Sequence, residues 1–214
     1  MSLLSREFAL LVHRIHVGTI EIIGSKGSAY HFEFSTTRQE VATSSDDHFE
    51  PFAKNCARSI AADEIKEKFI FYFANLLRRA VVGSHGTIVV CCENFNEKKP
   101  PEIADVVLIE PSLDFMDAFR SYLTIGSAES ITQLNRLEEL LAGFLSCDGI
   151  VVFDTSGGVV AYRGFYRSAS PLPTVVGGAR RRAFEGVKQL VGSAFVCALF
   201  QSQDGFTIYE GAPV

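Results

Sequence analysis

The 214-residue sequence contains no apolar run long enough to cross a membrane. Its first residues also lack the apolar core and cleavage site of a secretory signal peptide. There is no large excess of positive charge, since the formal net charge is −5, and this does not favour a general polyanion binder. These absences predict a cytoplasmic protein that has no membrane partner and does not bind DNA directly.

The cysteines show no spacing with histidine that fits a zinc site. They are odd in number, and most lie inside apolar segments: Cys56, Cys91, Cys92, Cys147 and Cys197. Buried free thiols are typical of proteins that stay in a reducing compartment. The cysteines therefore predict reduced thiols, in agreement with a cytoplasmic location.

The chain divides into two regions, with a boundary expected between residues 62 and 63. In the first region, residues 3–17 have a partial helical rhythm, and alternation in 18–23 and 28–34 predicts a β-hairpin. Patterns in the second region predict helices from 63 onward, at 113–123 and at 131–145, and strands at 87–92, 103–109, 150–153, 159–162, 194–200 and 206–209. The order strand, helix, strand implies a parallel crossover, which indicates an α/β fold.

The segment from Asp148 to Arg182 carries the main chemical signal. It opens with an acidic residue before an apolar run and closes with Gly177-Gly178 and the arginines 180–182 at the start of a helical pattern. The first N–H groups of a helix have no partner inside it, and glycines let an anion approach them closely. Arginines bind phosphate through a planar fork, whereas cations do not favour this helix end. The pattern indicates a bound anion; the alternative is a basic helix start that faces solvent.

Asp148 favours a nucleotide as that anion, because a carboxylate beside phosphates usually holds a divalent metal or activates a hydroxyl. Asp148-Gly149-Ile150 resembles the D-G-A motif of the diadenylate cyclase (DAC) domain, the nucleotide-binding domain of the DNA-integrity scanning protein and its relatives. Residues 178–183, Gly-Ala-Arg-Arg-Arg-Ala, resemble that family's G-T-R-H-R-A motif, and residues 84–90 look like its first core strand and preceding turn. The resemblance covers roughly residues 65–211 and implies a twisted mixed sheet flanked by helices, with the N-terminal hairpin as an extension.

The resemblance also implies an activity and a set of site residues. DAC domains bind one ATP per subunit and condense two ATP face to face into cyclic di-AMP and pyrophosphate, which implies a homo-oligomer. Asp148 would hold Mg²⁺ or Mn²⁺ and help to activate the attacking hydroxyl. The implied nucleotide-binding positions are Gly149, Ile150, Tyr166, Gly178, Ala179, Arg180, Arg181, Arg182, Gln201 and Ser202.

Several positions depart from the family pattern. Ala179 stands where the family has Thr, Arg181 replaces the central His, and Gln201-Ser202-Gln203 replaces an S-E-E stretch, so that Asp204 is the next carboxylate and a second, weaker metal candidate. These changes keep the phosphate-binding groups and remove groups that catalysis would use. They favour a sensor that binds ATP or a cyclic (di)nucleotide without turnover. The alternatives are an active cyclase with a divergent site and an interaction domain whose arginines face solvent.

Overall fold

The computed structural model describes residues 10–16, 19–24, 29–33, 48–82, 84–95, 97, 99–167 and 178–211. The chain forms two compact units, residues 1–46 and residues 47–214. The boundary expected after residue 62 would separate helix α1 (Phe49–Cys56) from the second unit. The structure includes α1 in that unit, because its Phe52 and Cys56 are fully buried in the same core as the helix that follows.

The first unit contains an antiparallel sheet of three strands, β1 (Leu10–His16), β2 (Thr19–Gly24) and β3 (Ala29–Glu33). The pairing of β2 with β3 confirms the predicted hairpin. The partial helical rhythm of residues 3–17 was misleading for β1, which pairs along its length with β2. Pairing with a neighbouring strand outweighs a weak local periodicity in such a segment.

The second unit is built on a mixed sheet of seven strands: β4 (Thr87–Cys92), β5 (Ile103–Ala104), β6 (Val107–Asp114), β7 (Ile150–Asp154), β8 (Gly158–Tyr166), β9 (Cys197–Gln201) and β10 (Thr207–Gly211). Their order is β10-β9-β4-β7-β8-β5, and β6 also pairs with β8. The central strands β4 and β7 are parallel, which confirms the predicted crossover, and the other pairs are antiparallel. The predicted α/β fold with a mixed sheet is therefore confirmed.

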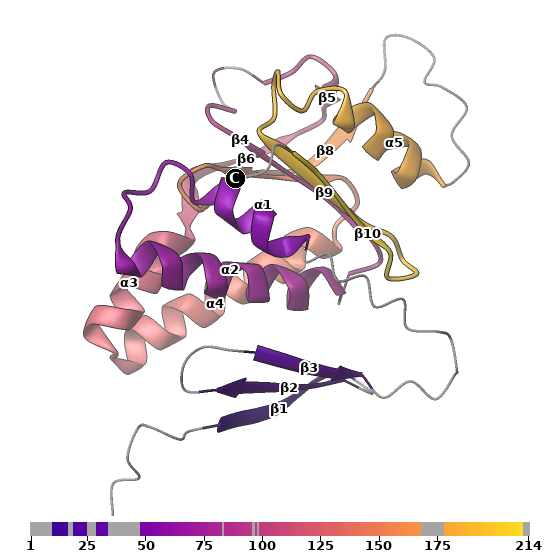
Figure 1. Ribbon diagram of the computed structural model, residues 1–214. Coiled ribbons are helices and arrows are strands. Elements are labelled where there is room, and N and C mark those ends of the chain that lie inside the picture. Colours follow the sequence, from indigo (N-terminus) through magenta and orange to yellow (C-terminus); the bar gives the residue numbers. More distant parts are fainter. Residues whose placement is uncertain are drawn as a thin grey trace, which may run out of the picture. The chain divides into compact units, whose positions relative to one another are not determined.

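Helices cover both faces of this sheet, as Figure 1 shows for the second unit. They are α1, α2 (Glu64–Val82), α3 (Phe115–Ile125) and α4 (Ala128–Ser146) on one face and α5 (Ala179–Lys188) on the other. Alternate residues of β4 serve the two cores: Val89 packs toward α1–α4, and Val90 packs toward α5. This burial on both faces explains why the strand sequence is continuously apolar.

Helix α4 leads directly to the segment that the sequence singled out. Ser127 caps its start, with the hydroxyl oxygen accepting a hydrogen bond from the Ser130 N–H at 3.2 Å. The helix ends at Ser146, and Cys147 is extended, so that Asp148 lies just before the central strand β7. Within the residues that the structure describes, no helix has both the length and the apolar character needed to cross a membrane.

Candidate functional site

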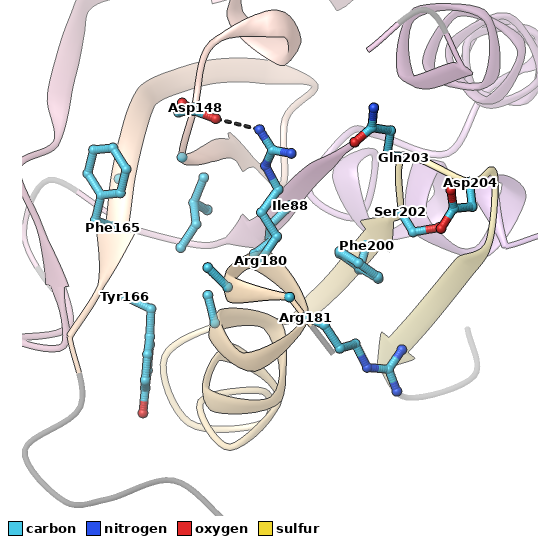
Figure 2. A pocket seen from close by; sticks show the side chains of 16 residues that line it. Ile88, Asp148, Phe165, Tyr166, Arg180, Arg181, Phe200, Ser202, Gln203 and Asp204 are labelled. Carbon is cyan, nitrogen blue, oxygen red and sulfur yellow. Dashed lines mark hydrogen bonds and ion pairs between the residues drawn. The ribbon is translucent and has the colours of Figure 1, made fainter. Parts of the chain in front are cut away.

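A cavity of about 710 Å³ lies at the amino ends of the two central parallel strands (Figure 2). Ile88 of β4 and Ile150 of β7 form part of its lining, together with Asp148 and Gly149, which precede β7. The volume falls within the range of about 300–1,000 Å³ that is usual for small-molecule sites. Ligands of doubly wound α/β folds bind at the opposite, carboxyl ends of the strands. Here β8 and β9 run antiparallel to the central pair, so their carboxyl ends meet at this cavity.

Gly149 places Asp148 at the cavity through a backbone that packs tightly on β8. Its φ is +116°, and a Cβ added there would lie 2.9 Å from the Cα and carbonyl carbon of Arg163 and from the carbonyl oxygen of Gly164. A side chain at this position would overlap backbone atoms and strain the chain. Glycine is therefore required by the packing of the protein itself, independently of any ligand.

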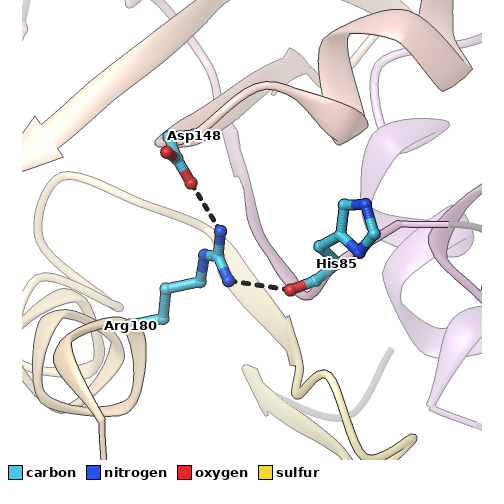
Figure 3. A network of polar contacts seen from close by, with 3 residues as sticks. All are labelled: His85, Asp148 and Arg180. Carbon is cyan, nitrogen blue, oxygen red and sulfur yellow. Dashed lines mark hydrogen bonds and ion pairs between the residues drawn. The ribbon is translucent and has the colours of Figure 1, made fainter.

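Asp148 and Arg180 form an ion pair at the cavity, with 2.5 Å between Asp148 Oδ1 and Arg180 Nη2 (Figure 3). Arg180 Nη1 donates a second hydrogen bond, of 2.7 Å, to the backbone carbonyl of His85. The two side chains are 74% and 42% exposed, so the pair is open to solvent. Exposed pairs of this kind contribute about 0–1 kcal/mol to stability, so this pair orients the guanidinium more than it stabilises the fold.

The amino end of α5 also faces the cavity. Gly178 is the N-cap residue in an extended conformation, and both Gly178 and Ala179 line the cavity. Among the described residues other than its chain neighbours, no atom lies within 4 Å of where a Cβ would stand at Gly178, which leaves space beside the first backbone N–H groups. These groups and the helix dipole together form a favourable environment for an anion.

Arg181 lines the cavity but is directed to other partners. Its guanidinium pairs with Glu185 at 2.9 Å and lies over the rings of Phe200 and Phe206, at 5.8 and 5.9 Å from their centroids. In Figure 2 its head group points away from Arg180. Arg181 therefore forms one edge of the cavity and holds part of the β9–β10 region against α5.

The wall opposite Arg181 is aromatic, formed by Phe165 and Tyr166 at the end of β8 (Figure 2). The Tyr166 ring packs against Gly186 of α5 so closely that a Cβ at Gly186 would overlap the ring. The helix therefore fixes the position of the ring. Aromatic rings that line a cavity offer a flat apolar surface to a ligand.

The structure brings together most of the residues that the sequence indicated: Asp148, Gly149, Ile150, Tyr166, Gly178, Ala179, Arg180, Arg181, Ser202 and Asp204. Two indicated residues lie outside the lining of the cavity. Arg182 is exposed on α5, and Gln201 is buried, with its side-chain oxygen accepting a hydrogen bond from the Thr207 hydroxyl at 3.0 Å.

Other lining residues were not anticipated from the sequence: Ile88, Gly164, Phe165, Ala183, Phe200 and Gln203. Apart from Gln203 they are glycine, alanine or apolar residues without a chemical signature, and they reach the cavity through strand register. The contact of Arg180 with the His85 carbonyl was also missed, because a backbone carbonyl has no side-chain signal. The only hint in the sequence was that His85 lies in the turn just before β4.

The carboxylates near the cavity do not form a metal-binding group. Asp148 is paired with Arg180, and Asp204 lies on the other side of the cavity in Figure 2. Across the described part of the chain, no cluster of three or more His, Cys, Asp or Glu side chains is arranged to hold a metal ion. A divalent cation at phosphates needs at least one or two free carboxylates, so these residues fit Mg²⁺ or Mn²⁺ poorly.

Comparison of the chain with protein-family models, with curated proteins and with solved structures gave no match. The geometry of the cavity is therefore the observation that bears on function. It combines one oriented guanidinium, a helix amino end and two aromatic side chains. This combination suits a ligand that carries both a phosphate and a flat ring system.

Proposed function

We propose that the chain binds ATP or a cyclic (di)nucleotide in this cavity and acts as a DAC-like sensor with a degraded catalytic site. The observation that carries the proposal is the meeting of Asp148 and Arg180, 32 residues apart in sequence, at one cavity. In this proposal Arg180 and the first N–H groups of α5 bind a phosphate, and Tyr166 contacts the base. Gly178 leaves room for the phosphate oxygens to approach the backbone.

The arrangement around the arginines supports a sensor more than an enzyme. Joining two ATP requires that a 3′-hydroxyl lose its proton and attack an α-phosphate while pyrophosphate leaves, with positive charge around the phosphates. Arg181, which replaces the family's histidine, is paired with Glu185, and Ala179 offers no hydroxyl. An active cyclase would depend on Asp148 and on Asp204, which lie on different sides of the cavity.

We further propose a cytoplasmic location and self-association. The five cysteines are free in the structure and four of them are buried, which suits a reducing compartment. The family chemistry requires two sites that face each other, and a sensor derived from it would keep that geometry. Sedimentation of the purified chain tests self-association, and a monomer at all concentrations would contradict it.

Incubation with ATP and Mg²⁺ or Mn²⁺, followed by chromatography, separates the sensor from the enzyme. The proposal predicts that ATP or a cyclic (di)nucleotide raises the melting temperature and that cyclic di-AMP does not accumulate. Accumulation of cyclic di-AMP by the wild-type protein but not by Asp148→Ala would establish the cyclase instead. If no nucleotide changes the melting temperature, the chain is an interaction domain without a nucleotide.

A further inference from the structure

The Asp148 carboxylate is engaged by a protein cation. Oδ1 accepts a hydrogen bond from Arg180 Nη2, and the same guanidinium donates through Nη1 to the His85 carbonyl (Figure 3). The two partners hold the guanidinium from two directions. Arg180 projects from α5, whereas Asp148 and His85 precede the strands β7 and β4, so the contacts connect three elements around the cavity.

Arg180 retains donors for a ligand while it keeps both of these contacts. A guanidinium carries five N–H groups in a planar fork, and the two contacts occupy two of them. A phosphate oxygen can therefore bind Arg180 without displacing Asp148. In this arrangement Asp148 sets the orientation of Arg180 and does not need to hold a metal ion.

The charges that line the cavity suit a ligand of low charge. Asp148 and Asp204 offset Arg180 and Arg181, so the formal side-chain charge of the described lining residues is zero. Arg181 is in addition paired with Glu185. What remains is the partial positive charge at the start of α5, about half an elementary charge. A nucleoside triphosphate needs cations or metal ions around its phosphates, whereas a phosphodiester carries a single charge on each phosphate.

We propose that the cavity binds a nucleotide phosphodiester, a cyclic mononucleotide or a cyclic dinucleotide, without a divalent cation, and that Asp148 is the positioning residue for Arg180. This inference rests on the proposed nucleotide-binding function and narrows its ligand. The phosphate is held by Arg180 and the first N–H groups of α5. Asp148 acts through Arg180 and does not contact the phosphate.

Calorimetric titration of the full chain with 3′,5′-cyclic AMP, cyclic di-AMP and ATP, each in EDTA and in Mg²⁺, tests the metal-free mode. We expect at least one phosphodiester to bind with an affinity that differs by less than about twofold between the two buffers. We expect ATP to bind more weakly than that phosphodiester in both. Which of the two diesters binds distinguishes a mononucleotide site from a dinucleotide site.

Variants at Asp148 test its role separately. Asp148→Asn keeps an oxygen that accepts from Arg180 and removes a negative charge near the ligand, so affinity for the diester in EDTA should equal or exceed that of the wild type. Asp148→Ala leaves Arg180 with the His85 carbonyl alone and should weaken binding by roughly tenfold. Glu139→Gln is the control, because Glu139 is an exposed carboxylate of α4 on the other face of the sheet, and it should bind like the wild type.

Two results would overturn the inference. One is tight binding of ATP with Mg²⁺ that EDTA weakens by more than about tenfold, and the other is an equal loss of binding in Asp148→Asn and Asp148→Ala. Both would leave nucleotide binding in place; the first would assign a metal ion to the site, and the second would show that the charge of Asp148 supports binding in some way other than by orienting Arg180. Binding of none of the three nucleotides in either buffer would instead overturn the proposed function itself.

Discussion

The Asp148 carboxylate and the Arg180 guanidinium are 2.5 Å apart at the lining of one cavity. Asp148 follows the end of α4, whereas Arg180 lies 32 residues further along the chain, in the first turn of α5. Two motifs separated in sequence thus converge on one site. The fold achieves this by placing the turn before β7 opposite the start of α5.

Removal of the Arg180 side chain should affect binding and leave the fold intact. Arg180→Ala removes a charged donor from the phosphate and should weaken nucleotide binding by roughly tenfold to a hundredfold. Stability should change by no more than about 1 kcal/mol, because its ion pair is exposed. Calorimetry and urea unfolding measure the two effects.

Arg136→Ala is the matched control for Arg180, since Arg136 is exposed on α4, on the other face of the sheet. It should bind nucleotide like the wild-type protein. Equal affinity of wild type and Arg180→Ala would contradict the assignment of the phosphate to α5.

A side chain at position 149 should destabilise the protein. Gly149→Ala would force alanine into a positive-φ conformation and bring its Cβ to 2.9 Å from the backbone of Arg163. Strain of this kind costs roughly 1–3 kcal/mol. Urea unfolding should show a loss of stability of that size, with reduced nucleotide binding because Asp148 moves with its neighbour.

A side chain at position 143, in contrast, should stabilise the protein. Gly143 lies on the exposed side of α4, and a Cβ there would meet no atom within 4 Å from the described residues beyond the helix's own backbone. Gly143→Ala should raise stability by about 0.5–1 kcal/mol, since glycine is unfavourable inside a helix. If Gly149→Ala and Gly143→Ala changed stability to a similar extent, the positive φ of Gly149 would not restrict which residue can stand there.

The position of the Tyr166 ring should depend on Gly186. The methyl group of Gly186→Ala would overlap the ring and displace it from the cavity wall. Calorimetry should show weaker nucleotide binding by this variant, whereas Tyr166→Phe keeps the ring and should bind nearly as well as the wild type. Unchanged affinity of Gly186→Ala would exclude the ring from the ligand site.

A buried thiol should make the protein sensitive to alkaline pH. Burial raises the pKa of the Cys92 thiol from 9.0 to about 12, with smaller contributions from Cys91 and Asp154. A pKa raised by folding gives stability that is complete below pH 9 and is lost as the pH rises toward 12. Between pH 8 and pH 11 this thiol should account for a loss of about 2–3 kcal/mol.

Urea unfolding of wild-type protein and Cys92→Ala at several pH values measures this loss. The stability of the variant should fall less steeply above pH 9, although its starting value will be lower because a core side chain is missing. Parallel curves for the two proteins would show that Cys92 does not contribute to the pH dependence.

The main helices and strands of the second unit were predictable because burial in the core alone explains their apolar patterns. The run at residues 87–92 is apolar throughout, and β4 has these bounds because it is buried on both faces of the sheet. The apolar spacing from residue 63 onward predicted α2, whose Phe69 and Phe73 stack in the core. The strands predicted at residues 150–153 and 159–162 correspond to β7 and β8, which pair as antiparallel neighbours.

The details of the site were less predictable because they depend on register and side-chain direction. Three consecutive arginines look alike in sequence, yet a helix turns about 100° per residue and directs them differently. Arg180 reaches Asp148, Arg181 reaches Glu185, and Arg182 lies outside the cavity lining. Phe165 lines the cavity because β8 ends there, and no feature of the β8 sequence marks a ligand site.

Nuclear magnetic resonance titration of the uniformly labelled chain would locate a bound nucleotide, because each backbone N–H reports its own surroundings. On addition of cyclic di-AMP or ATP, we expect the largest shifts at Ala179, Arg180 and Gly149, whereas Gly143 of α4, on the other face of the sheet, should stay unchanged. Shifts confined to residues away from the cavity, or no shifts with either nucleotide, would contradict nucleotide binding in this cavity.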